Sequence, residues 1–168
     1  MPPKSEPKKT PSNRELTELA RRLVAEQNTL TLATTDGRAA WAAPVYYVFV
    51  KSIFYFLSSP DSRHITEALG SGQVSAAVHA TASTWQAIKG LQMTGRIQAV
   101  KPGLEAARVL PAYLKKYPFT EDFFKDNLSL DLDAFAKRFG VKLYGFKPSL
   151  VYYLDNQIRF AFREKVTL

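Results

Sequence analysis

Cysteine is absent from this 168-residue chain, which excludes disulfide bonds and metal sites with thiolate ligands. Histidine is scarce, and two residues of this type are too few for a histidine-rich metal centre, so no metal site is expected. The sequence also lacks the GxSxG, GxGxxG and P-loop motifs, which argues against a nucleophile-elbow hydrolase, a Rossmann domain and a P-loop nucleotidase. No catalytic residue can be assigned from these patterns.

Long apolar runs are absent as well. The first residues have no apolar signal-peptide core, and no run approaches the length of a membrane-spanning helix. We therefore expect a cytoplasmic protein that does not contact membranes.

Positive charge is what the chain has in excess, because 23 lysines and arginines stand against 15 acidic residues and give a net charge of +8. Residues 1–13 are basic, contain four prolines and are poor in apolar side chains, a composition typical of a disordered tail. The chain is 46% hydrophobic, enough for a sizeable core, so residues 14–168 are predicted to form one domain. Its positive charge suits an anionic ligand or loose contact with nucleic acid.

The order of predicted elements favours a mainly β protein with accessory helices. Ser12 and Glu15 have the spacing of a capping box, and a helix of about four turns should follow and end near Asn28. Strands are predicted at 29–35, 38–50, 53–58, 73–80, 86–100 and within 142–162, and helices at 63–69, 103–117, 121–127 and 132–139. Short strands in this order predict a small antiparallel barrel.

Turn and proline positions refine this expectation. Asp36–Gly37 is a strong hairpin signal, and a second turn is expected at Asp155–Asn156. Pro44 within a strand predicts an edge, a bulge or a bend, and Pro111 predicts a kink in its helix.

The segment LSSPDSRHITEAL, residues 57–69, leads from a predicted strand into a predicted helix and offers a candidate binding site. Ser58 lies at the strand end and Ser62 at the helix start, where backbone N–H groups and the helix dipole attract anions. Arg63 can bind two phosphate oxygens, and His64 can donate a further hydrogen bond. One interpretation is a phosphate site. The other is an ordinary polar connection in which Ser62 caps the helix while Arg63 and His64 face water.

The predicted strand at 86–100 has an unusual pattern, because each of its faces mixes apolar and polar residues. Lys89 belongs to one face and Gln92 to the other. Taken alone, both are ordinary solvated residues. Beside a phosphate site, they become candidates for contacts with the phosphate and ring of a flavin.

The succession NTLTLATTDGRAAWAAPVYYVFV, IFYFLSSPDSRHITEAL, QVSAAVHA and IKGLQMTGRIQAV resembles the pyridoxamine 5'-phosphate oxidase-like FMN-binding split barrels. The resemblance covers about residues 27–100. It implies a six-stranded antiparallel split β-barrel that forms a homodimer, with FMN in a cleft between the subunits. It further implies that Ser58, Ser62, Arg63, His64 and Lys89 hold the phosphate, that the backbone at Ala43, Pro44 and Val45 lines the flavin ring, and that Gln92 lies near ring or phosphate.

Two departures from that pattern limit what the resemblance implies. His64 stands where a lysine is common, which makes phosphate affinity weaker or more dependent on pH. The chain also lacks the basic C-terminal substrate motif of the vitamin-processing oxidases, so their reaction is not assigned. Whether Arg163 and Lys165 reach the partner's flavin stays open, as does the identity of substrate and electron donor.

The resulting hypothesis is an FMN-dependent oxidoreductase that acts on a small molecule. The alternatives are a flavin or haem carrier without turnover and, ranked lower, a basic small barrel that binds nucleic acid. A related deazaflavin in place of FMN is also left open.

Overall fold

A computed structural model describes residues 10–118, 120, 136–137 and 139–168. It begins with helix α1, Asn13–Glu26, whose predicted capping box is present: Ser12 Oγ accepts from the Glu15 amide, and the Glu15 carboxylate accepts from the Ser12 amide. One face of α1 is buried in the core. The predicted helices at 121–127 and 132–139 and most of the predicted tail lie outside the described residues, apart from short pieces of the second helix.

The described strands form one antiparallel sheet in the order β2-β1-β5-β6-β7-β4-β3, with β8 paired to β7. Their bounds are β1 Thr29–Thr35, β2 Ala40–Tyr46, β3 Val48–Val50, β4 Ile53–Ser58, β5 Val74–His79, β6 Lys89–Ala99, β7 Lys142–Asp155 and β8 Arg163–Lys165. The prediction of six strands is therefore corrected to eight. Six was the number implied by the family resemblance. In the structure Tyr47 divides the predicted strand at 38–50 into β2 and β3, and the C-terminal stretch, predicted as two or three strands, forms β7 and β8.

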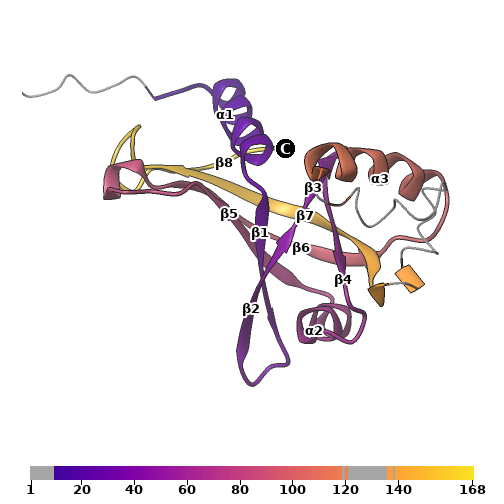
Figure 1. The fold of residues 1–168 in the computed structure, drawn as a ribbon. Coiled ribbons are helices and arrows are strands. Elements are labelled where there is room, and N and C mark those ends of the chain that lie inside the picture. The colour runs from indigo at the N-terminus through magenta and orange to yellow at the C-terminus, as the bar shows by residue number, and fades with distance from the viewer. Residues whose placement is uncertain (1–9, 119, 121–135, 138) are drawn as a thin grey trace, which may run out of the picture.

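The sheet curls into a split barrel because its two edge strands are neighbours in the chain. β2 and β3 stand at opposite ends of the strand order, yet only Tyr47 separates them. The two ends of the sheet must therefore meet, as the strongly curved ribbon of Figure 1 shows. Pro44 lies in β2, which confirms the prediction of an edge strand.

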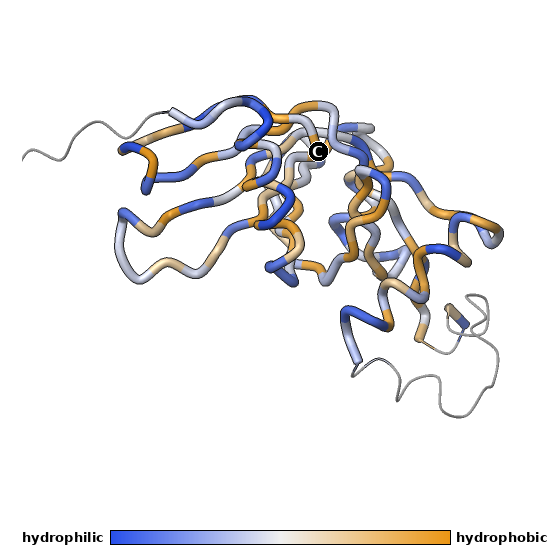
Figure 2. Tube along the Cα trace, turned by 90° about the horizontal axis from the view of Figure 1, so that it is seen from above, coloured by the Kyte–Doolittle hydropathy of each residue, from blue (hydrophilic) through white to orange (hydrophobic). Residues whose placement is uncertain are grey.

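One hydrophobic core fills the barrel. It contains the buried residues of α1 together with the inward side chains of the strands, among them Leu30, Leu32 and Phe54. Buried and exposed residues alternate along β1, β5 and most of β6, as expected for a sheet with one face on a core, and Figure 2 shows hydrophobic and hydrophilic residues intermixed along the chain. The polar face of β1, β5 and β6 is not covered by a described helix, and this outer face contains the hollows discussed below.

Two further helices complete the described fold. Helix α2, Arg63–Ser71, follows β4 and ends at Gly72, whose left-handed conformation (φ 67°) terminates it. Helix α3, Leu104–Lys116, contains Pro111 and packs on a second apolar cluster outside the barrel. No helix within the described ranges is long and apolar enough to cross a membrane.

Tyr117 and Lys116 join the end of α3 to the end of α1. The buried Tyr117 hydroxyl lies 2.8 Å from the Asn28 carbonyl and 2.6 Å from the Tyr47 carbonyl, and Lys116 Nζ donates to the Gln27 carbonyl at 2.7 Å. Burial lowers the pKa of Lys116 to about 8. These contacts tie the helices together on the side of the barrel away from α2 (Figure 1).

Candidate functional site

The first turn of α2 gathers three polar side chains that the sequence suggested as phosphate ligands. Ser58 Oγ, at the end of β4, lies 2.8 Å from His64 Nε2 and 3.1 Å from Ser62 Oγ. Ser62 Oγ is 3.3 Å from His64 Nε2 and donates to the Ser59 carbonyl at 2.8 Å. We call these three residues the Ser-His cluster.

Ser62 occupies the N-cap position of α2, but its side chain does not cap the helix. The first two helical amides, those of Arg63 and His64, form no hydrogen bond with the described residues, whereas the next two donate to the Ser62 carbonyl. Unpaired amides at a helix start, together with the helix dipole, favour an anion. The expected side-chain cap at Ser62 is therefore absent, and the assignment of this turn as a phosphate site stays a prediction.

His64 is the titratable member of the cluster. Partial burial lowers the pKa of His64 below its ordinary value of 6.5, so the ring is neutral at pH 7. A neutral imidazole can accept from Ser58 or donate to it, and a bound phosphate would favour the donating, protonated form.

The lowered pKa of His64 has a consequence for stability. Between the folded and unfolded pKa values the unfolded chain binds more protons, so the free energy of unfolding of the ligand-free protein falls as pH decreases through 6.5. Urea denaturation at about pH 7.5 and 5.5 should show a smaller decrease for His64→Asn than for the wild type. Equal decreases in the two proteins would contradict a buried, neutral His64.

Arg63 is not directed at the Ser-His cluster. Its Nε donates to Glu67 Oε1 at 2.6 Å, its guanidinium lies 4.8 Å from the centre of the Trp41 ring, and its Nη2 donates to the Ala39 carbonyl at 3.4 Å. Glu67 also accepts from Thr34 Oγ1 at 2.7 Å, and the Arg63 hydrogen bond lowers the pKa of Glu67. Arg63 thus ties α2 to the β1–β2 hairpin, and its assignment as a phosphate ligand stays a prediction.

Strand β2 runs beside α2 and β4 on the open edge of the sheet. Ala43 is buried, Val45 is half-buried and Pro44 is exposed. An edge strand leaves part of its backbone N–H and C=O groups without a strand partner, and these groups can bind a planar ring with polar margins. The predicted ring-binding backbone therefore neighbours the element that bears the Ser-His cluster.

Lys89 and Gln92 lie far from this cluster within one chain. Ser58 pairs with Lys142 of β7, whereas Gln92 pairs with Tyr152, ten residues further along the same strand. At about 3.3 Å per residue this is roughly 33 Å of strand. Figure 1 places α2 and the first residues of β6 at different ends of the molecule. One chain cannot bring both sets of residues to one mononucleotide.

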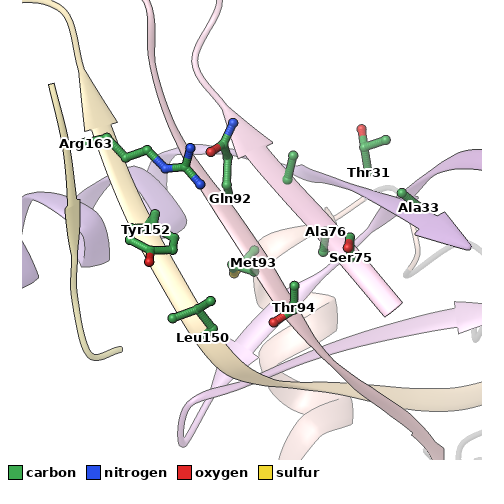
Figure 3. A pocket seen from close by; sticks show the side chains of 11 residues that line it. Thr31, Ala33, Ser75, Ala76, Gln92, Met93, Thr94, Leu150, Tyr152 and Arg163 are labelled. Carbon is green, nitrogen blue, oxygen red and sulfur yellow. The ribbon is translucent and has the colours of Figure 1, made fainter. Parts of the chain in front are cut away.

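Gln92 lines a hollow of about 310 Å³ on the outer face of the sheet. Figure 3 shows Arg163 beside Gln92 at one end of this hollow, and the Arg163 guanidinium lies 4.5 Å from the centre of the Tyr152 ring. Lys89 belongs to the opposite face of β6, the face that carries the buried Leu91 and Met93. Lys89 and Gln92 thus lie on opposite faces of β6, as the sequence predicted, and Arg163 lies beside Gln92. Their assignment to the flavin stays a prediction.

Sequence reasoning missed the roles of Glu67, Trp41 and Tyr152. Glu67 could have been found, because it stands four residues after Arg63 on a predicted helix, the spacing of a stabilising ion pair. Trp41 and Tyr152 meet their arginines only through the tertiary fold, and no local signal marks them. The described residues contain no group of histidines and acids that could hold a metal ion.

No family model matches this chain. It is 28% identical over 137 residues to the UPF0306 protein of Cronobacter sakazakii (strain ATCC BAA-894), a match that covers 80% of the chain and 92% of that protein.

Solved structures with very different sequences share the architecture. A haem-binding protein from Mycobacterium smegmatis matches with a TM-score of 0.68 at 19% identity, over 94% of this chain and 59% of that one. The chain thus spans less than two thirds of that larger protein. A FAD-binding protein from Mesorhizobium loti matches with a TM-score of 0.57 at 14% identity, over 80% of this chain and 90% of that one.

The chain has the split β-barrel fold. This confirms the predicted architecture apart from the number of strands. At these sequence identities the likeness shows the fold alone and does not identify a cofactor.

Proposed function

We propose that this protein binds FMN, with the flavin phosphate at the Ser-His cluster. The observation that supports this is the first turn of α2, where Ser58, Ser62 and His64 converge and the amides of Arg63 and His64 have no hydrogen-bond partner in the described part of the chain. Two hydroxyls, an imidazole and two amides are a donor set that suits a phosphate group. The backbone of β2 beside it would line the ring, at Ala43, Pro44 and Val45.

The site is completed by a second copy of the chain. Gln92 and Arg163 lie far from the Ser-His cluster, because the partners of Gln92 and Ser58 on β7 are ten residues apart. This distance is too long for both groups of residues in one chain to contact the same flavin. In a two-fold symmetric dimer the hollow around Gln92 of one subunit can face the ring bound by the other. Lys89, on the opposite face of β6, would then contact the ligand only at the strand end.

The proposed activity is that of an oxidoreductase for a small-molecule substrate. Bound flavin would supply hydride or electron transfer, which agrees with the absence of recognisable catalytic motifs in the sequence. The chain's own residues would hold the phosphate, orient the ring along the β2 edge and present Gln92 and Arg163 to its polar margin.

A carrier that binds flavin or haem without turnover is the second candidate, supported by the split barrels named as a haem-binding and a FAD-binding protein. Haem needs an axial ligand, and His64 is the half-buried histidine of the described chain. Its Nε2 lies 2.8 Å from Ser58 Oγ, an arrangement that suits a phosphate better than an iron.

The visible spectrum of the purified protein during titration with FMN and with riboflavin tests this proposal. We expect flavin absorption bands and saturable FMN binding that is about tenfold or more tighter than riboflavin binding, because only FMN offers a phosphate to the cluster. Equal affinity for both flavins would contradict the phosphate site. An intense haem band without flavin binding would favour the haem carrier, and no binding of either would exclude both proposals.

A further inference from the structure

A second, larger cleft lies on the outer face of the sheet and adjoins the hollow around Gln92, which is one half of the proposed flavin site. It measures about 760 Å³, within the usual range of small-molecule sites, and crosses β1, β5, β6 and β7. Hydroxyl and amide side chains line it, including Thr35, Gln73, Ser75, Thr94 and Gln98. It shares Ala33, Ser75 and Thr94 with the hollow around Gln92, so the two are continuous.

Two basic side chains, those of Arg96 and Lys147, lie next to each other in this cleft. Arg96 of β6 and Lys147 of β7 are directly opposite each other in the antiparallel ladder, so their side chains share one face. Both are exposed, and neither forms an ion pair or hydrogen bond with the described residues. Among the described residues, no aspartate or glutamate lines the cleft.

This arrangement costs stability in the absence of a ligand. Like charges directly opposite each other on neighbouring strands repel and destabilise the pairing of those strands. The register that creates the pair is fixed, because the ladder shifts between Thr94 and Gly95 and Gly95 packs against the Lys147–Pro148 backbone. The pair is therefore held in place by the fold.

We propose that this cleft binds a small oxyanion, the phosphate or carboxylate group of a small molecule, through Arg96 and Lys147. A guanidinium binds two oxygens of such a group at once, the ammonium adds a third contact, and the hydroxyls of Thr94 and Ser75 supply neutral donors. The inference does not depend on flavin binding, because no residue of the Ser-His cluster lines the cleft.

Calorimetric titration and thermal unfolding of the full chain with inorganic phosphate, pyrophosphate or succinate test this inference. Sodium chloride of matched ionic strength serves as the reference. We expect saturable binding of phosphate or succinate. The anion with the higher affinity shows whether the cleft recognises a phosphate or a carboxylate group. Arg96→Gln and Lys147→Gln should each weaken the binding of this anion by about tenfold or more. Without anion, each variant should melt at or above the wild-type temperature, because the repulsion is removed.

Two controls separate this site from others. Lys101→Gln removes an exposed lysine that does not line the cleft and should bind the anion like the wild type. Ser62→Asp removes any phosphate bound at the Ser-His cluster, so the anion binding that remains in this variant is the binding assigned to Arg96 and Lys147. The inference is overturned if neither phosphate nor succinate binds saturably, if chloride stabilises the protein as much as they do, or if Arg96→Gln and Lys147→Gln retain wild-type affinity.

Discussion

Gly95→Ala should lower the free energy of unfolding by about 3 kcal/mol, the upper part of the range for overpacking a tightly packed site. A Cβ atom at Gly95 would overlap the Lys147 carbonyl oxygen and lie 2.8 Å from Pro148 Cα. Both obstacles are backbone, so β6 and β7 would have to separate at the shift in their register. Urea denaturation measures the loss directly.

Gly70→Ala is the matched control for this prediction. Gly70 lies within α2 and has no heavy atom within 4 Å of the position its Cβ would take. Alanine is favoured over glycine inside a helix by about 0.5–1 kcal/mol, so this variant should be slightly more stable than the wild type. A Gly95→Ala protein within about 0.5 kcal/mol of the wild type would show that the strands are not packed this closely.

Ser62→Asp should reduce FMN affinity about 100-fold while leaving the fold intact. Aspartate is as good an N-cap residue as serine, and Ser62 makes no cap bond of its own, so α2 should be equally or more stable. A carboxylate in the Ser-His cluster removes a donor and places a negative charge against the phosphate. A 100-fold loss corresponds to about 2.7 kcal/mol. Quenching of flavin fluorescence during titration provides the measurement.

Riboflavin distinguishes this effect from a general disturbance of the site. It lacks the phosphate, so its affinity should be the same for Ser62→Asp and the wild type. If both flavins lose affinity equally, the substitution acts through the fold and not through the phosphate. If FMN binds Ser62→Asp as tightly as the wild type, the phosphate lies elsewhere.

Local patterns predicted the elements that depend on near neighbours in the sequence. The capping box at Ser12 and Glu15, the hairpin at Asp36–Gly37 and the edge position of Pro44 were all confirmed. Each reflects a conformational preference that a few residues impose by themselves. Helix α3 continues through Pro111 from Leu104 to Lys116, so the proline does not end the helix, and the kink stays a prediction.

The candidate site was predicted less completely, because it depends on contacts between distant segments. The gathering of Ser58, Ser62 and His64 follows from a strand that runs directly into a helix, and the sequence contained that information. Glu67 stands four residues after Arg63, a spacing that predicts an ion pair on a helix, and this ion pair competes with a phosphate for the Arg63 guanidinium. The separation of Gln92 from Ser58 depends on the register of β6, β7 and β4, which no local pattern specifies.

The neighbours of the basic side chains on the outer face of the sheet could not be predicted from the sequence either, because they also depend on strand register. Arg96 and Lys147 are 51 positions apart in the sequence, and only the β6–β7 register sets them opposite each other. Arg163 reaches Tyr152 and the hollow around Gln92 because β8 pairs with β7 after a turn. In both cases the side chains are exposed and polar, so hydrophobic periodicity gives no indication of their neighbours.

The central claim is that one flavin is held by the Ser-His cluster of one subunit and by Gln92 and Arg163 of another. Two variants separate these halves: Ser62→Asp, and the double variant Gln92→Ala with Arg163→Gln. Each alone should bind FMN at least about tenfold more weakly than the wild type. In a mixed dimer, one of the two sites would combine the intact Ser-His cluster of the double variant with the intact Gln92 and Arg163 of the Ser62→Asp chain.

Titrating FMN into a refolded equimolar mixture of the two variants tests this claim most directly. Random pairing should restore wild-type affinity at about one quarter of all sites, because half of the dimers are mixed and each of these has one intact site of two. A mixture that forms mixed dimers but recovers no tight FMN binding would contradict a site shared between subunits.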